Sequence, residues 1–586
     1  MSETSTVLTP AERRAALERD FAPWEPRTID GLFDQAVEKH GSRPYVIAGD
    51  AIYTYADVQA RAYRFADGLR ALGVQRGDHV ALLMANFPEY TPLKLAIARV
   101  GAVAVPLNYL YKTPELEYAL EQSHSRFLIT MTSYRDQDYL AMLDELAPEW
   151  GGLGHTGLGN LERVITFSPT GDERRDGVLD IESLERIGAE CPGAAPGGER
   201  RPEDPSDIMY TSGTTGKPKG VLLTHDSTLR SAYGSAHCRA LPDGNKVVFA
   251  LPCYHMFGYE QAVLASMFVG GAILPQPKFE PLDYFRAIEK YGVTDVLAVP
   301  TMSVALVEHT ERSRYDLTSL ARMLSAAAVA PMWLWERIRS DLGVTELTTA
   351  YGMTELSGAT TMTLPEDPLE VTASTVGRPK PAGAAGVTER GGAMAEIRVV
   401  HPLTGEEVAP GETGELISRG PTTMLGYWDR PEETAEVLRG EWMHSGDMGR
   451  FLEDGSLVIT GRSKEVFKSG GELVMPKEIE DFLTSLDGVS QAHVVGLPDE
   501  RWGEVCCAFV SPEPGATVVP EELVEACHAN LARFKVPRRV FVVDPTEVPQ
   551  TPSGKVQKFR LIPMAQDLIG TDAPTGIRTV NQHQGE

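Results

Sequence analysis

An eleven-residue stretch from Tyr210 to Gly220 carries the residue types that bind phosphate. Its sequence, YTSGTTGKPKG, holds three glycines, two lysines and four serine or threonine hydroxyls, and no acidic residue. Glycines let the backbone approach an anion closely, and successive N–H groups in such a turn can form an anion-binding nest. Lysines add charge that pairs with phosphate. The stretch therefore predicts a phosphate-binding loop, and its alternative is an ordinary glycine- and threonine-rich surface turn.

This glycine loop does not match the Walker A motif, which requires G-x-x-x-x-G-K-[ST]. Gly213 and Gly216 are only three residues apart, and Pro218 follows Lys217 directly. Because the residue before a proline is disfavoured in a helix, a helix beginning at the lysine, as in a P-loop, is not expected. The loop predicts a phosphate site of another class.

Two further segments place a carboxylate beside a glycine. In YGMTE, residues 351–355, Tyr351 could stack on a base and Thr354 could donate to a phosphate. Glu355 could hold Mg²⁺, a hard cation that prefers oxygen. In HSGD, Asp447 could accept two ribose hydroxyls, as an acidic residue does in dinucleotide sites. Taken alone, each segment also fits a solvated turn.

Basic residues and glycines recur in the last quarter of the chain. Arg462 and Lys464 lie in GRSKE, and the guanidinium of Arg462 suits bidentate contacts to oxygen. The alternative is a solvated linker at a domain boundary. The pair Gly470-Gly471 has β-rich flanks and also fits a plain hairpin. Lys555, in TPSGK, follows a turn that would expose its ammonium, which suits transient neutralisation of a phosphoryl group. Alone, it is an ordinary surface lysine.

Length and charge limit the class of protein. The chain has 586 residues and a net charge of −27, and its length predicts roughly three or four compact units. The charge disfavours nucleic acid or an anionic membrane as the main partner. Six cysteines without C-x-x-C spacing fit a reduced protein without structural zinc. No signal-peptide core and no run of membrane-spanning length is evident, so we expect a soluble, cytoplasmic protein without membrane insertion.

The elements that must position these residues follow three successive patterns. From about Thr28, helical periods alternate with short β-rich runs such as HVALLMAN and GAVAVPLN, and the alternation resumes after the glycine loop with KVVFALP and DVLAVP. This predicts parallel sheets covered by helices. From about Ala393, short strands and turns predict a β-rich subdomain. From near Gly461, a last unit of about 110 residues has a small α+β pattern.

Taken together and in this order, the motifs resemble the adenylate-forming superfamily, which includes acyl-CoA synthetases, peptide-synthetase adenylation domains and beetle luciferases. The resemblance extends from about Thr28 to Ile562 and rests on VGAVAVPLN, YTSGTTGKPKGV, YGMTE, VGRP, GELISRG, GYW, HSGD, GRSKE, KSGGE and TPSGKV. It implies an α/β fold with a large N-terminal domain over 1–461, two α/β subdomains and a β-rich one. A hinge at 462–465, a small mobile α+β domain over 466–572 and a disordered tail over 573–586 follow.

The resemblance also implies a chemistry. In the family, a carboxylate attacks the α-phosphorus of ATP with Mg²⁺ present, giving an acyl-adenylate and pyrophosphate. The C-terminal domain then rotates, and a thiol, commonly that of CoA, attacks the adenylate to give a thioester and AMP. The implied partners are ATP, Mg²⁺, CoA and a small carboxylic acid, with no nucleic acid; a homodimer is compatible with this picture.

Motif matching carries the family's nucleotide roles onto this chain. The resemblance assigns the β- and γ-phosphates and the departing pyrophosphate to Thr211, Ser212, Gly213, Thr214, Thr215, Gly216 and Lys217. Tyr351 and Gly352 flank adenine, Thr354 contacts the α-phosphate and Glu355 binds Mg²⁺.

The remaining roles fall toward the C-terminus. Asp447 takes the ribose hydroxyls with Arg462 beside it, and Lys464 is the hinge residue. Lys555 matches the lysine that bridges the carboxylate and the α-phosphate during adenylation. The loop that lines the pantetheine tunnel after rotation matches Ser469, Gly470 and Gly471.

By family position, the acid pocket is lined by Tyr254, His255, Phe257, Gly258, Met302, Ala326, Ala327 and Ala328. His255 is either a gate beside the substrate or a satisfied core histidine. Relatives usually carry an S-G-G-A-P-like run where this chain has SAAAVA, residues 325–330. Since each added methyl removes room and backbone freedom, we expect a compact aryl or medium-chain acid.

The favoured interpretation is therefore a free-standing carboxylic acid–CoA ligase, because the segment KSGGE resembles the corresponding segment of CoA ligases more than that of carrier-loading enzymes. Three alternatives stay open. The enzyme could load a separate carrier protein, or it could activate another anion, such as nitrite for coupling to an aryl amine. The chain could also be a non-catalytic nucleotide-binding scaffold.

Overall fold

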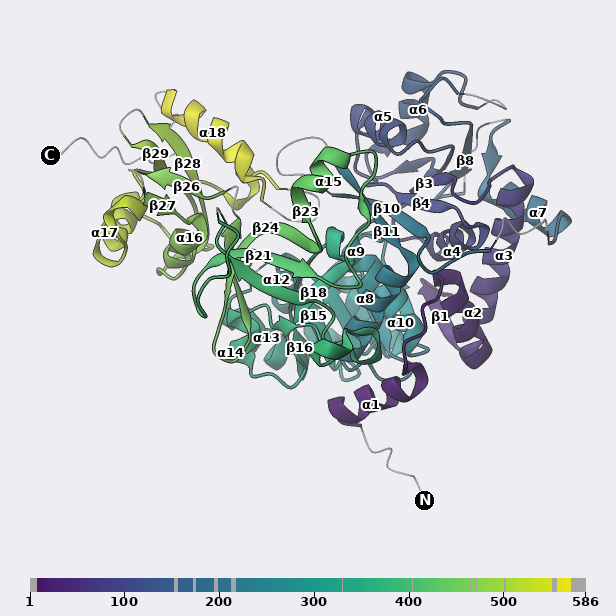
Figure 1. Cartoon of the computed structure of the whole chain (residues 1–586), viewed down its shortest axis with the longest axis horizontal. Coiled ribbons are helices and arrows are strands. Elements are labelled where there is room, and N and C mark those ends of the chain that lie inside the picture. Colours follow the sequence, from purple (N-terminus) through teal and green to yellow (C-terminus); the bar gives the residue numbers. More distant parts are fainter. Residues whose placement is uncertain are drawn as a thin grey trace. The chain divides into compact units, whose positions relative to one another are not determined.

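The computed structural model describes residues 8–151, 156–171, 175, 177–193, 199–211, 218–328, 330–402, 404–462, 465–469, 472–499, 502–550 and 556–570 (Figure 1). The chain divides into two compact units. The first unit comprises residues 1–213, 217–396 and 418–443, and the second comprises 214–216, 397–417 and 444–586. Over the described residues, helices of sufficient length and apolarity to cross a membrane are absent.

An eight-stranded sheet forms one half of the first unit, in the order β22-β11-β10-β4-β3-β5-β8-β9. Its strands are β3 (His79–Leu83), β4 (Val103–Pro106), β5 (Phe127–Met131), β8 (Arg163–Phe167), β9 (Leu179–Asp180), β10 (Pro205–Thr211), β11 (Lys219–Thr224) and β22 (Gly426–Tyr427). Pairing is parallel from β10 to β9, and antiparallel in the pairs β10–β11 and β11–β22. Every residue of β3 is buried, as expected for a parallel strand covered on both faces.

A seven-stranded sheet forms the other half, in the order β16-β15-β14-β12-β13-β1-β2. Its strands are β1 (Pro44–Ala48), β2 (Ala51–Thr54), β12 (Lys246–Phe249), β13 (Ala272–Pro275), β14 (Asp295–Ala298), β15 (Arg322–Ser325) and β16 (Glu346–Thr348). All pairs are parallel except β1–β2. Beside it, β17 (Ala350–Met353), β18 (Gly358–Met362) and β19 (Arg378–Pro379) form a small sheet.

Helices cover the two sheets, as Figure 1 shows. The longer ones are α1 (Pro10–Phe21), α2 (Ile29–His40), α3 (Tyr55–Ala71), α4 (Tyr90–Val100), α5 (Thr113–Gln122), α6 (Tyr139–Leu146), α7 (Ile181–Glu190), α8 (His225–Cys238), α11 (Pro281–Tyr291), α12 (Pro300–Glu308) and α13 (Met332–Leu342). Shorter ones are α9 (Met256–Gly258), α10 (Ala265–Phe268), α14 (Leu369–Ser374) and α15 (Pro431–Val437). Between α9 and α10 the chain forms a π-helix, η1 (Tyr259–Leu264).

The second unit contains the expected β-rich region and the α+β region. The β-rich region is formed by β20 (Glu396–Val400), β21 (Gly414–Arg419), β24 (Trp442–Phe451) and β25 (Leu457–Arg462). The α+β region has strands β26 (Phe467–Ser469), β27 (Glu472–Val474), β28 (Val489–Asp499), β29 (Gly503–Pro512) and β30 (Arg539–Val542), with helices α16 (Pro476–Thr484), α17 (Pro520–Asn530) and α18 (Lys558–Gly570).

Alternate residues of β29 fill two separate cores. Cys506 packs with one buried cluster and Cys507 with the other, because successive side chains of a strand point to opposite faces. The predicted fold class, α/β sheets followed by a small α+β region, is confirmed.

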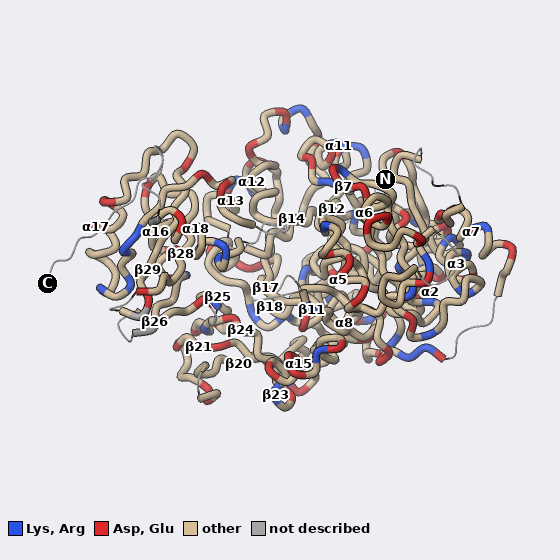
Figure 2. Tube along the Cα trace, turned by 90° about the horizontal axis from the view of Figure 1, so that it is seen from above, with Lys and Arg blue, Asp and Glu red and all other residues tan. Residues whose placement is uncertain are grey.

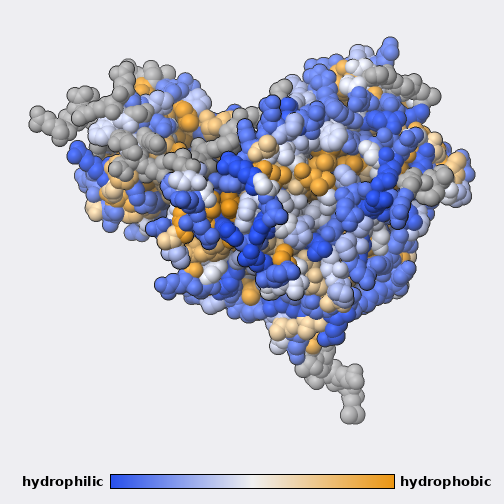
Figure 3. Space-filling model, in the orientation of Figure 1, coloured by the Kyte–Doolittle hydropathy of each residue, from blue (hydrophilic) through white to orange (hydrophobic). Residues whose placement is uncertain are grey.

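Charged residues of both signs occur throughout the described chain. Figure 2 shows acidic and basic residues interspersed along the tube. Figure 3 shows a visible face that is mostly hydrophilic, with apolar residues in small groups.

Candidate active site

The glycine loop lies at the turn of the hairpin formed by β10 and β11. Residues 212–217, which include Ser212, Gly213, Thr214, Thr215, Gly216 and Lys217, lie outside the described residues. The strands on either side are described, and Thr211 at the end of β10 pairs with Lys219 at the start of β11. The Thr211 hydroxyl lies 3.5 Å from the Lys219 carbonyl oxygen. The hairpin thus fixes where the predicted phosphate loop begins and ends.

Side chains from α5 hold both ends of that hairpin turn. The Tyr118 hydroxyl donates to the Pro218 carbonyl at 2.9 Å. On the other strand, the Tyr210 hydroxyl donates to Gln122 Oε1 at 2.6 Å, and Gln122 Nε2 donates to the Trp428 carbonyl at 2.8 Å. Burial raises the pKa of Tyr210 well above its ordinary value, so its phenol stays a donor. These contacts restrict the loop's ends without involving its glycines.

The segment YGMTE forms β17 and a short 3₁₀ turn, η3 (Thr354–Leu356). Gly352 is needed for packing: a methyl group there would lie 2.1 Å from the Gly358 carbonyl oxygen of β18. A bulge lies between Tyr351 and Gly352 in this strand pair, and Tyr351 is partly buried. Thr354 at the start of η3 is buried.

Glu355 is a buried carboxylate held in place by a segment distant in sequence. Its Oε1 accepts a hydrogen bond from the Tyr427 hydroxyl at 2.8 Å, and its backbone carbonyl accepts from the Met424 N–H at 2.9 Å. The Ser357 hydroxyl donates to the Thr422 carbonyl at 2.8 Å. Burial and the Glu355 charge raise the pKa of Tyr427 well above its ordinary value, which keeps the phenol as the donor of this bond.

Glu355 offers a buried carboxylate, the kind of oxygen ligand that Mg²⁺ prefers. Among the described residues, no group of three or more His, Cys, Asp and Glu side chains could hold a metal ion. Mg²⁺ is commonly bound by one or two carboxylates together with substrate phosphates. A single buried carboxylate therefore fits an ion that arrives with ATP.

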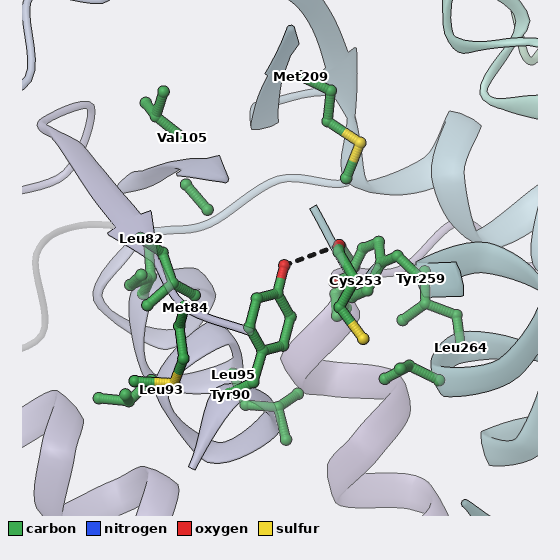
Figure 4. Packing of buried hydrophobic residues seen from close by; sticks show 14 of the residues in the cluster. Leu82, Met84, Tyr90, Leu93, Leu95, Val105, Met209, Cys253, Tyr259 and Leu264 are labelled. Carbon is green, nitrogen blue, oxygen red and sulfur yellow. Dashed lines mark hydrogen bonds between the residues drawn. The ribbon is translucent and has the colours of Figure 1, made fainter. Parts of the chain in front are cut away.

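The turn that carries the acid-pocket candidates is anchored by α4 and the end of β3. Asn86 Nδ2 donates to the Leu251 carbonyl at 2.9 Å, and Asn86 Oδ1 accepts from the Cys253 N–H at 3.0 Å. The Tyr90 hydroxyl donates to the Cys253 carbonyl at 2.8 Å, the dashed line in Figure 4. Cys253 is buried, and its burial raises the pKa of its thiol, so it serves packing. The sequence patterns gave no signal for Asn86 or Tyr90 as anchors.

Four pocket candidates lie on this turn and on α9. The Tyr254 ring meets the Tyr109 ring edge-on, with centroids 5.2 Å apart. His255 is exposed, and its Nδ1 accepts from the N–H of Phe257 at 3.2 Å; it is not a core histidine. At Gly258, a methyl group would lie 2.4 Å from the Leu251 carbonyl oxygen, so the close backbone approach requires glycine. Helix α9 packs against β18, the strand that follows η3, so the pocket candidates lie near the segment that carries Glu355.

The alanine run follows β15. Ala326 is buried, whereas Ala327 and Ala328 are exposed; residue 329 lies outside the described residues. Ala327 has φ of +75°, in the left-handed region that costs a residue with a Cβ roughly 1–2 kcal/mol. Met302 lies on α12, whose Ser303 hydroxyl is 3.0 Å from the Ser325 hydroxyl at the end of β15. The run therefore adopts a backbone suited to glycine while carrying methyl groups.

In the second unit, Asp447 and Arg462 face each other across β24 and β25. Arg462 Nε donates to Asp447 Oδ1 at 2.8 Å. Asp447 lies within a strand, and its N–H donates to the Ser445 hydroxyl at 3.0 Å. Glu415 accepts from the N–H of Gly446 at 3.2 Å. The predicted pairing of the arginine with the aspartate is present in this unit.

The other C-terminal candidates are described only in part. Ser469 is buried in β26, where it pairs with Glu472 of β27. The residues between them, Gly470 and Gly471, lie outside the described residues, as do Lys464 and Lys555.

Known proteins share both the sequence and the architecture. The family model of the AMP-binding enzyme matches residues 33–428, and that of the AMP-binding enzyme C-terminal domain matches residues 478–555. A putative acyl-CoA synthetase of Bacillus subtilis is 34% identical over 91% of this chain and 96% of its own length. A feruloyl-CoA synthase of Amycolatopsis sp is 34% identical over 90% of this chain and 98% of its own.

A solved structure extends the likeness to the fold. The crystal structure of an anthranilate CoA ligase in complex with anthranoyl-AMP is 25% identical, with a TM-score of 0.79, covering 93% of this chain and 98% of that one. The chain belongs to the AMP-binding enzyme family, the adenylate-forming enzymes that its motifs resemble. Within that family it is an enzyme of the acyl-CoA ligase class, which uses ATP-dependent adenylation.

Proposed function

We propose that this enzyme joins an aryl or medium-chain carboxylic acid to CoA through an acyl-adenylate, with Mg²⁺ bound by Glu355. The observation that carries the proposal is the convergence of three motif segments in the first unit. The glycine-loop hairpin, Glu355 and the acid-pocket turn are linked through β11, Tyr427 and β18. This arrangement of the described segments supports a single site for phosphate, metal and acid.

The proposed mechanism must overcome the repulsion between the negative charges of the acid and of ATP. A carboxylate attacking the α-phosphorus of ATP is an anion approaching a polyanion, so positioning and neutralisation decide the rate. Bound Mg²⁺ would supply charge neutralisation at the phosphates. The glycine loop would hold the β- and γ-phosphates, Thr354 would donate to the α-phosphate, and Lys555 would bridge the acid and the α-phosphate. No general base is needed, because the nucleophile is already ionised.

The second half-reaction is proposed to follow a rotation of the C-terminal domain about Lys464. The loop of Ser469, Gly470 and Gly471 would then line the path of the pantetheine arm. In the nucleotide part of the site, the buried Asp447 carboxylate, oriented by Arg462, would accept the ribose hydroxyls. We propose the domain division 1–461, 462–465 and 466–572 for this motion.

Two observations support a compact acid. Ala327 and Ala328 add methyl groups to the wall after β15, where relatives usually carry glycines. The similar proteins include a feruloyl-CoA synthase, medium-chain acyl-CoA ligases and an anthranilate CoA ligase. The proposed site of action is the cytoplasm, which the six unpaired cysteines support.

The deciding experiment measures pyrophosphate release from ATP and Mg²⁺ with benzoates, cinnamates, fatty acids of increasing length and nitrite, each with and without CoA. The proposal expects one aryl or medium-chain class to respond, the response to rise with CoA, and the product to have the mass of an acyl-CoA. Palmitate exceeding every aryl acid would overturn the substrate class. A response to nitrite alone, or one indifferent to CoA, would favour anion activation or carrier loading instead.

A further inference from the structure

We infer that Tyr427 is a positioning residue that orients the Glu355 carboxylate toward the metal–nucleotide complex. This inference rests on the proposed function. It assigns a role to a residue that lies 72 positions after Glu355 in the sequence. Tyr427 lies in the motif GYW, to which the sequence patterns gave no chemical role.

The hydrogen bond from Tyr427 to Glu355 is shielded from water. Tyr427 is 8% exposed and Glu355 is 7% exposed. The Tyr427 hydroxyl lies 2.8 Å from Glu355 Oε1. A hydrogen bond to a charged group is stronger in such surroundings than in water. Since the phenol donates to one defined oxygen, Oε1, it restricts the rotation of the carboxylate.

The backbone of Tyr427 is fixed to the strand that leaves the glycine loop. Tyr427 pairs with Val221 of β11, and its N–H donates to the Thr434 hydroxyl of α15 at 2.9 Å. The next residue along, Trp428, donates its N–H to the Gly220 carbonyl at 2.7 Å. The position of the phenol is therefore set by the loop's own hairpin.

The ring of Tyr427 also contacts a cation at the loop's exit. The Lys219 ammonium lies 4.8 Å from the ring centroid, a distance that allows a cation–π interaction. One side chain thus contacts Lys219, two residues after the last loop position, and the candidate metal carboxylate.

The test replaces Tyr427 with phenylalanine, which keeps the ring under Lys219 and removes only the hydroxyl. ATP affinity of the full chain is measured by calorimetry over a series of Mn²⁺ concentrations, and protein-bound Mn²⁺ is followed by electron paramagnetic resonance. Tyr427→Phe is expected to raise the Mn²⁺ concentration for half-maximal ATP binding about tenfold. ATP affinity without divalent cation is expected to change less than twofold.

Tyr63→Phe is the matched control, because the Tyr63 hydroxyl also donates to a carboxylate, Asp34, at 2.8 Å. It is expected to leave the Mn²⁺ dependence unchanged. In a Glu355→Gln background, Tyr427→Phe is expected to add no further change, since coupled residues are not additive. If the wild type shows metal-promoted ATP binding and Tyr427→Phe has the same Mn²⁺ dependence, the role of Tyr427 is overturned while the proposed function stands. A wild type without metal-promoted ATP binding would overturn the proposed metal role itself.

Discussion

Glu260 and Lys380 form an ion pair in the interior of the first unit, with the carboxylate oxygen 3.5 Å from the ammonium nitrogen. Both side chains are inaccessible to solvent. Lys380 also donates to the Ser231 carbonyl at 2.9 Å and the Ser235 hydroxyl at 3.0 Å on α8. Because Glu260 lies in η1, two residues after Gly258, the pair connects the acid-pocket segment to α8 and to the chain that follows β19.

The first prediction concerns this pair. Lys380→Met leaves the Glu260 carboxylate buried without its cation, so we expect a loss of about 3–5 kcal/mol in the free energy of unfolding. The measurement is denaturant unfolding with the slope compared between variants. Lys380→Met combined with Glu260→Gln should recover most of the loss. If the double variant were as unstable as the single one, the charge pairing would not be the cause.

The pH dependence of Lys380→Met has a definite sign. Burial already raises the pKa of Glu260, and loss of the ammonium removes the group that opposes this shift. A carboxyl whose folded pKa lies above its unfolded pKa binds protons more tightly in the fold, so stability falls as pH rises through that range. The variant should therefore be less destabilised at pH 5 than at pH 8.

Local patterns predicted the elements of this fold but not the contacts between distant segments. Fully buried strands such as β3 appear in the sequence as nearly continuous apolar runs. The π-helix η1 was not predicted, because residues 259–268 are all buried and no polar face marks their period. Tyr427 and Glu355 are 72 residues apart, and Lys380 and Glu260 are 120 apart. Periodicity carries no information about such pairs.

The second prediction concerns His493 in β28. Burial and the nearby Lys558 and Lys477 lower the pKa of His493 to about 4, against about 6.5 for an unperturbed histidine. Below pH 6.5 the unfolded chain binds the proton first, so stability falls as pH drops toward 4. At pH 5 the loss is about 2 kcal/mol by this linkage.

His493→Gln removes the titrating group and should flatten the fall in thermal stability between pH 7 and pH 5. The exposed His528 of α17 supplies the matched variant, His528→Gln, which should retain the wild-type fall. Parallel pH profiles for wild type and His493→Gln would show that the acid sensitivity arises elsewhere.

The third prediction isolates the backbone of the alanine run. Ala327→Gly and Ala328→Gly increase the entropy of the unfolded chain equally, but only Ala327 has a positive φ. The left-handed conformation costs alanine roughly 1–2 kcal/mol, so Ala327→Gly should be more stable than Ala328→Gly by about that amount. Urea unfolding of both variants is the measurement. Equal unfolding free energies would indicate that Ala327 is not held in this conformation in solution.

The last prediction separates the two half-reactions. Lys555 is proposed to neutralise charge between the acid and the α-phosphate, a role needed only for adenylation. Lys555→Ala should therefore reduce pyrophosphate release by about a hundred- to a thousandfold, the loss typical when one charge-stabilising donor is removed. It should spare thioester formation from preformed acyl-adenylate and CoA. Equal losses in both assays would rule out this role.

Lys464→Pro is the opposite case, since a proline at the proposed hinge restricts the backbone rotation that follows adenylation. Pyrophosphate release in a single turnover should persist, while acyl-CoA formation from preformed adenylate should fall. The two lysine variants thus have opposite expected ratios of the two half-reactions. If Lys555→Ala and Lys464→Pro only destabilised the fold, each variant would lose adenylation and thioester formation together. A chemical role for Lys555 and a conformational role for Lys464 are therefore supported only if each variant loses a different half-reaction.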